Sequence, residues 1–121
     1  MTNEEWLEEA KECYPGWYSF IKVLDERLDY LFPRGYQIDQ IKEKFGTLRF
    51  YCRGDAQDDI VHDIARCCVT AAESMSARIC MYCGEPGKTR LDVSWHCTLC
   101  DACFAKQYPD YKKTEFISEG R

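Results

Sequence analysis

The sequence predicts an α+β protein in which helices and a β-hairpin precede a cysteine-rich C-terminal module. Two periodicities and one motif support this prediction. Apolar residues recur at helical spacing in two long segments, and they alternate every second residue in a short one. Two C-x2-C pairs follow near the C-terminus. We therefore expect three parts: a body at residues 1–77, a metal-binding ribbon at 78–108 and a tail at 109–121.

Two helices are expected at the start of the body. Thr2 and Glu5 form a capping-box pattern, so the first helix should span residues 3–13. A Pro-Gly pair at 15–16 then interrupts the chain, and a second helix should span about residues 17–32. The second helix has an apolar stripe at helical spacing, made of Trp17, Phe20, Ile21, Leu24, Leu28 and Leu31.

A β-hairpin is expected next. Its second strand has apolar residues on alternate positions, namely Leu48, Phe50 and Cys52. The first strand should span residues 36–44, where the three-residue spacing of Ile38 and Ile41 indicates a bulge. Phe45 and Gly46 are the expected reversal between the two strands.

A long third helix should complete the body, from about Asp58 to Ala77. Its apolar residues recur at steps of three and four and are expected to face the core: Ile60, Ile64, Cys67, Cys68, Ala71 and Met75. Free cysteine behaves as a small hydrophobic residue. Cys67 and Cys68 are therefore interpreted as core thiols rather than as a redox sensor.

The two C-x2-C pairs have the spacing of a structural zinc site, which predicts a zinc ribbon. Sixteen residues separate the pair Cys80 and Cys83 from the pair Cys100 and Cys103. Each pair can turn two thiolates onto one ion from a tight knuckle, and four thiolates complete a tetrahedron. Because no coordination position stays open, one structural Zn²⁺ is expected and not a catalytic one.

Cys97 is the alternative ligand. Cys97 and Cys100 form a second C-x2-C pair, which would shorten the spacer to thirteen residues and leave Cys103 over. We therefore favour Cys100 and Cys103 as the second pair. His96 is a further substitute ligand, although a histidine in the strand of a small hairpin is more often a surface residue.

Cysteine number and the N-terminal sequence predict a cytoplasmic protein with no membrane association. Nine cysteines in 121 residues are an odd number, which excludes a complete set of intramolecular disulfides. The first twelve residues contain five glutamates and no apolar leader segment. No apolar run reaches the length of about 18 residues that a membrane span needs. The cysteines are therefore expected to be thiols or metal ligands in a reducing compartment.

Charge and motif content favour a binding protein over an enzyme. The net charge is −5, with 15 acidic and 9 basic residues in 1–77 and with 6 acidic and 7 basic residues in 78–121. Proteins that bind duplex nucleic acid usually carry a basic footprint, which this chain lacks as a whole. The sequence also has no recognisable nucleophile motif and no glycine-rich phosphate loop. We therefore expect no catalytic activity.

Basic residues interleaved with aromatic ones are the candidates for partner binding: Lys42, Lys44, Arg49, Tyr51 and Arg53 in the hairpin, and Arg90 and Trp95 in the ribbon. Such a pattern can follow a phosphate backbone and stack bases. The solvated outer face of a two-stranded sheet produces the same pattern, and zinc ribbons bind protein as readily as nucleic acid. A protein partner is the leading hypothesis, nucleic acid is the alternative, and thiol redox sensing is the least favoured.

Two segments resemble a family of small, uncharacterised bacterial and prophage zinc-ribbon proteins. Residues 41–51, IKEKFGTLRFY, are similar to a KEKFG-x-LRFY motif, and residues 76–103 are similar to a CxxCG…W…TLCD-x-C motif. The resemblance covers about residues 36–104 and implies the ligand set Cys80, Cys83, Cys100 and Cys103. A cysteine at position 97 departs from the family pattern. The prophage members imply an inhibitor or adaptor that acts on a host protein, with host defence systems among the candidates.

Overall fold

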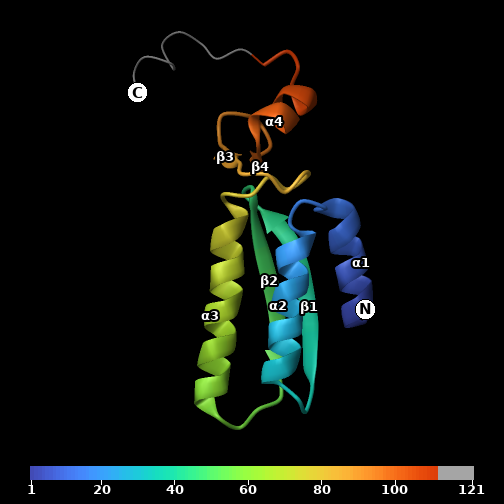
Figure 1. Cartoon of the computed structure of the whole chain (residues 1–121), viewed down its shortest axis with the longest axis vertical. Helices are drawn as coiled ribbons and strands as arrows, with labels where there is room; N and C mark the ends of the chain where they lie inside the picture. The colour runs from blue at the N-terminus through green and yellow to red at the C-terminus, as the bar shows by residue number, and fades with distance from the viewer. Residues whose placement is uncertain (112–121) are drawn as a thin grey trace.

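The computed structural model describes residues 1–111, and within them four helices and two antiparallel hairpins form an α+β fold (Figure 1). The predicted fold class is therefore confirmed. The helices are α1 (Asn3–Cys13), α2 (Tyr18–Leu31), α3 (Asp59–Ser76) and α4 (Asp101–Gln107). The strands are β1 (Tyr36–Lys44), β2 (Thr47–Gly54), β3 (Lys88–Arg90) and β4 (Cys97–Leu99). All but the first three residues of the predicted tail, 109–121, lie outside the described residues.

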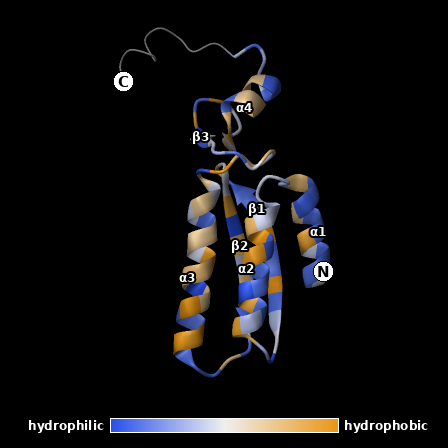
Figure 2. Ribbon diagram, in the orientation of Figure 1, coloured by the Kyte–Doolittle hydropathy of each residue, from blue (hydrophilic) through white to orange (hydrophobic). Residues whose placement is uncertain are grey.

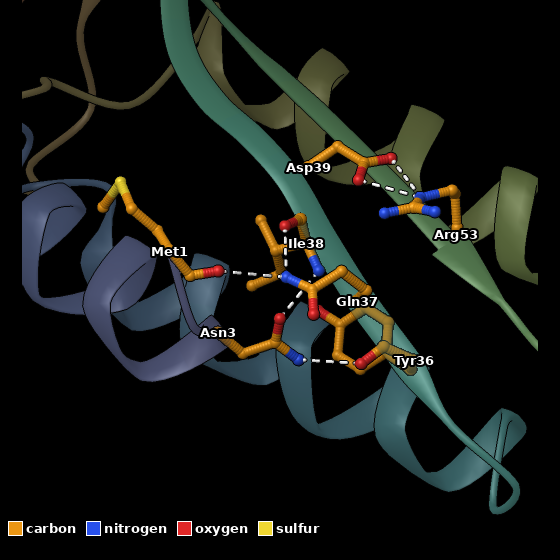
Figure 3. Close-up of polar contacts among 7 residues, drawn as sticks. All are labelled: Met1, Asn3, Tyr36, Gln37, Ile38, Asp39 and Arg53. Atoms are coloured by element: carbon orange, nitrogen blue, oxygen red, sulfur yellow. Dashed lines mark hydrogen bonds and ion pairs between the residues drawn. The ribbon is translucent and has the colours of Figure 1, made fainter.

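α1 begins at the predicted capping box and covers one edge of the first hairpin. The Thr2 hydroxyl accepts a hydrogen bond from the Glu5 N–H, and the Glu5 carboxylate accepts one from the Thr2 N–H. Asn3 then holds β1 with both ends of its amide. Its nitrogen donates to the Tyr36 carbonyl at 3.0 Å, and its oxygen accepts from the Ile38 N–H at 2.7 Å (Figure 3). These bonds satisfy backbone groups that an open strand edge would expose.

The β1–β2 hairpin has the predicted bulge and the predicted turn. The pairing shifts between Ile38 and Gln40, at the position where the apolar spacing changes from two to three. Phe45 and Gly46 form the two-residue connection, with φ of 56° and 88°. Positive φ at both positions is the pattern of a type I′ turn, which matches the twist of the flanking strands.

α3 presents a different side to the core from the predicted one. Of the residues that the sequence pattern assigns to the core, Ile60 is 65%, Ile64 45% and Met75 38% exposed. Cys67 and Ala71 are exposed as well, and only Cys68 is half-buried. The buried residues of α3 are Ala65, Ala72 and Ser76.

Polar side chains of α3 explain why this side of the helix, and not the predicted one, faces the core. The Ser76 hydroxyl accepts a hydrogen bond from the Leu48 N–H at 2.8 Å, and the Glu73 carboxylate accepts one from the Phe50 N–H at 2.9 Å. Both donors belong to β2, so α3 covers the β2 edge as α1 covers the β1 edge. The small buried residues let α3 approach the sheet closely. The larger apolar side chains of α3 are exposed to solvent.

One hydrophobic core joins the body to the ribbon. α2 fills its centre, and the ribbon stacks on the end of the body where α2 begins and α3 ends (Figure 1). Both α2 and β2 carry apolar residues along their length (Figure 2), and those buried in the core include Ile21, Leu24 and Leu28 of α2 and Leu48 and Phe50 of β2. The core includes Trp17, Ile21, Leu28 and Leu48 from the body, and Cys80, Met81, Cys97 and Leu99 from the ribbon. Residues on both sides of the predicted boundary near residue 78 thus belong to this core.

Candidate metal centre

The structure brings the four predicted ligands together. The Sγ atoms of Cys80, Cys83, Cys100 and Cys103 all lie within 4.8 Å of one another, and those of Cys83 and Cys100 are 3.5 Å apart. Four thiolates bound at about 2.3 Å to one tetrahedral zinc ion lie about 3.8 Å from each other. The arrangement of the four sulfur donors therefore fits one metal ion of the size of zinc with tetrahedral coordination.

The first knuckle is closed by backbone hydrogen bonds. The Cys80 N–H donates to the Glu85 carbonyl at 2.8 Å, and the Gly84 N–H donates to the Cys80 carbonyl at 3.0 Å. Gly84 has a φ of 83°, which glycine adopts without the steric cost that a Cβ atom brings. This bend returns the chain beneath the cysteine pair and aims both thiols to one side.

The second knuckle is held by the start of α4. Cys100 is the N-cap of this helix, and its Sγ accepts a hydrogen bond from the Cys103 N–H at 3.4 Å. Arg90 braces the same turn from β3. Its guanidinium donates to the Leu99 carbonyl at 2.9 Å and to the Asp101 carboxylate at 2.8 Å, and it lies 4.5 Å from the centre of the Phe104 ring.

The electrostatics of the cluster favour a cation. Loss of hydration and hydrogen bonds from the neighbouring thiols raise the pKa of Cys103 to about 12. Cys80 shows the opposite direction: burial disfavours its thiolate, but backbone N–H groups of Cys100 and Cys83 lower its pKa to about 6. Four adjacent thiols cannot all ionise without positive charge, and a divalent ion removes that obstacle.

The two alternative ligands lie elsewhere. Cys97 is buried in β4 and does not belong to the group of four. Burial raises the pKa of its thiol, and the Tyr108 hydroxyl partly offsets that rise. The His96 ring packs near Phe45, with ring centroids 6.5 Å apart. Within residues 1–111, the metal-ligand geometry is therefore that of the predicted C-x2-C-x16-C-x2-C set alone.

The metal centre rests on the loop between α1 and α2. The Gly16 N–H donates to the Met81 carbonyl at 2.8 Å, and the Trp17 indole N–H donates to the Ile79 carbonyl at 2.8 Å. From the sequence pattern, Gly16 is predicted only to interrupt the chain between two helices. Its contact with the first knuckle joins two segments far apart in the chain and has no periodic signature from which it could be predicted.

The hairpin residues predicted to bind a partner share its outer face. Arg49, Tyr51 and Arg53 alternate with inward-facing residues of β2. Lys42 lies opposite Arg49 in the β-ladder, and its Nζ is 5.9 Å from the centre of the Tyr51 ring. Arg53 is already paired with Asp39 at 2.9 Å (Figure 3). The side chain of Arg53 is nevertheless 74% exposed, whereas Arg49 is half-buried and donates to the Thr47 hydroxyl and the Leu48 carbonyl.

Trp95 lines a cleft at the junction of body and ribbon, which we call the aromatic cleft. Its volume is about 360 Å³, and it is lined by Glu43, Lys44, Phe45, Ser94, Trp95 and His96. Trp95 is 71% exposed and Phe45 64% exposed. Phe45 is not among the residues predicted to bind a partner. One sequence feature could have indicated this role. Asparagine is preferred directly before the glycine of a two-residue turn, and Phe45 has a bulky aromatic side chain at that position.

Arg90 differs from the other predicted partner-binding residues. Its side chain is 10% exposed and is fully engaged with Leu99, Asp101 and Phe104. Arg90 therefore supports the second knuckle and leaves little surface for a partner.

Comparisons of the chain with models of protein families, with curated proteins and with solved structures found no match. No helix in the described part of the chain is long and apolar enough to cross a membrane. The metal centre and the aromatic cleft are therefore the features from which function is inferred.

Proposed function

We propose that this chain is a zinc-stabilised, non-catalytic interaction module that binds a protein partner through the aromatic cleft. The observation that carries the proposal is the pair of exposed aromatic side chains, Trp95 and Phe45, that line one cleft. A site of four thiolates leaves no position for substrate or water on the ion. The metal therefore serves to hold the ribbon, and with it Trp95, against the tip of the hairpin.

The backbone of Phe45 supports a binding role. Its φ of 56° lies in the left-handed region, which costs a residue other than glycine on the order of 1–3 kcal/mol. The strained position turns the aromatic ring outward, where Lys44 Nζ lies 5.5 Å from the ring centre. Strain of this kind is typical of functional surfaces, because selection for stability alone would remove it.

The surroundings of the cleft indicate the chemistry of the partner. Lys44 lines the cleft, and Lys42 and Arg49 extend positive charge along the outer face of the hairpin. Protein interfaces typically combine a buried aromatic anchor with a charged rim. The matching partner surface has an apolar side chain that enters the cleft and acidic residues that meet the basic rim.

The resemblance to prophage proteins extends this proposal to the biological role. A small module with one recognition cleft and no catalytic apparatus suits an inhibitor or adaptor of a host protein, such as a component of a defence system. The cytoplasm is the proposed compartment, because zinc thiolate sites persist where thiols stay reduced.

Binding to a purified partner tests the proposal. Affinity capture from the native host supplies the partner, and calorimetry then compares the wild type with Trp95→Ala and Phe45→Ala. Removal of a central aromatic anchor should weaken binding at least about 10-fold. Tyr30→Ala is the matched control, because Tyr30 is an 84% exposed aromatic residue on α2. Equal affinity of all four proteins would overturn the proposal.

Nucleic acid is the second candidate partner, on one specific observation. Lys42 and the exposed ring of Tyr51 are adjacent on the outer hairpin face, an arrangement that can contact a phosphate and stack a base. A mobility-shift titration across a salt series separates the two candidates. Tight binding that falls steeply with salt and is lost in Lys42→Ala would replace the protein-partner proposal.

A further inference from the structure

One face of α3 is apolar and exposed along the whole length of the helix. We call it the α3 seam, and its members are Ile60, Ile64, Cys67, Ala71 and Met75. Successive steps of four, three, four and four residues keep these side chains on one side of a helix, as in the contact stripe of a coiled coil. α3 forms the edge of the helical layer, and most of its length is apolar in hydropathy (Figures 1 and 2).

We propose that the α3 seam is the interface with a second copy of this chain, in which the two α3 helices pack antiparallel about a two-fold axis. This inference does not depend on the proposed function, because the α3 seam and the aromatic cleft share no residue.

Side-chain size favours the antiparallel arrangement. The N-terminal half of the seam has two large residues, Ile60 and Ile64, whereas the C-terminal half has the small Ala71 followed by the large Met75. In an antiparallel pair centred near Cys67, Ile64 of each copy lies opposite Ala71 of the other, and Ile60 lies opposite Met75. A parallel pair would place alanine against alanine and leave a gap, which loses packing contacts.

Charge favours the same arrangement. Asp59 is exposed in the first turn of α3, and Arg78 is exposed just beyond its last turn. Neither side chain forms an ion pair with any of residues 1–111. Antiparallel packing brings Asp59 of one copy near Arg78 of the other at both ends of the interface. Opposed helix dipoles add to this attraction, whereas a parallel pair would place like charges together.

Analytical ultracentrifugation of the zinc-loaded full chain tests the proposal. The wild type should be a dimer, and Ile60→Glu or Ile64→Glu should weaken the dimer at least about 100-fold, because each change acts twice in a symmetric interface. Leu91→Glu is the matched control, since Leu91 is 64% exposed against 65% for Ile60. Circular dichroism and metal content verify that each variant is folded. A wild-type monomer at millimolar concentration, or an unchanged dimer in both isoleucine variants, would overturn the proposal.

Two further variants test the orientation. Asp59→Arg alone should weaken the dimer, and Asp59→Arg combined with Arg78→Asp should restore it; a double variant as weak as the single one would exclude the antiparallel pairing. Cys67 lies near the middle of the seam, so a short bis-maleimide should link two copies through it. Loss of the covalent dimer in Cys67→Ser, but not in Cys13→Ser, is the expected result, and the reverse would contradict the interface.

Discussion

A Cβ atom on Gly16 would lie 2.0 Å from the carbonyl oxygen of Cys80 and 2.6 Å from the backbone nitrogen of Gly84. The loop between α1 and α2 thus touches the backbone of the first metal knuckle with no space for any other residue. This contact joins the ribbon to the body.

Gly16→Ala should therefore damage both parts at once. Two backbone segments would have to separate, which should cost at least about 3 kcal/mol of unfolding free energy. Gly35→Ala is the comparison, because a Cβ atom on Gly35 meets nothing within 4 Å and changes only the backbone strain. Urea denaturation and metal retention against a chelator are the measurements. Equal metal retention in Gly16→Ala and the wild type would show that the contact is dispensable.

Ser76→Ala should reveal the bond that fixes the rotation of α3. The Leu48 N–H is buried and donates to the Ser76 hydroxyl, so the change leaves it without that acceptor. A buried donor without a partner costs about 1–3 kcal/mol. Ser74→Ala on the exposed side of α3 should change the unfolding free energy by less than about 0.5 kcal/mol. Equal unfolding midpoints in urea for the two variants would contradict this assignment.

Phe45→Asn should separate stability from binding. Asn-Gly is the preferred pair for a turn with positive φ at both positions, so the free energy of unfolding should rise by about 1 kcal/mol. Binding of the partner should weaken, because the exposed ring is lost. Thermal unfolding and calorimetry measure the two effects. A variant that is less stable than the wild type would show that the ring packs in the fold instead of serving a partner.

Cys52 should resist alkylation at neutral pH. Burial raises the pKa of its thiol to about 11, and only the thiolate reacts. At pH 8 it should react about 200-fold more slowly than a thiol of ordinary pKa near 8.5. Exposed Cys13 serves as the internal reference in a mass-spectrometric time course. Because folding raises this pKa, the free energy of unfolding also depends on pH. The contribution of the neutral Cys52 thiol to that free energy is complete below about pH 9 and is lost as the pH rises toward 11.

Local features of the fold could be predicted from the sequence because neighbouring residues determine them. The capping box at Thr2, the bulge after Ile38 and the turn at Phe45 all follow from short patterns. The ligand set follows from spacing as well, because two knuckles need only a few residues each. Cys97 lies outside the group of four converging thiols, as its spacing predicts, because a pair of Cys97 and Cys100 would leave Cys103 over.

Long-range features could not be predicted in the same way. The apolar residues of α3 do recur at helical spacing. Glu73 and Ser76, however, accept hydrogen bonds from β2, and the apolar stripe of α3 therefore faces solvent. Periodicity identifies which side of a helix is apolar. It does not show which neighbouring element, if any, covers that side. Likewise, the approach of Gly16 to Cys80 depends on how two distant segments pack. The aromatic cleft is also lined by two segments that lie far apart in the sequence, residues 43–45 and 94–96.

The metal content of the purified chain tests the central claim most directly. Elemental analysis of protein produced without added metal should find one zinc per chain in the wild type and in Cys97→Ser, but none in Cys100→Ser. The last variant should also lose its cooperative unfolding transition, because binding of the ion and folding are coupled. Absence of metal from the wild type, or full zinc in Cys100→Ser with loss in Cys97→Ser, would contradict the proposed centre.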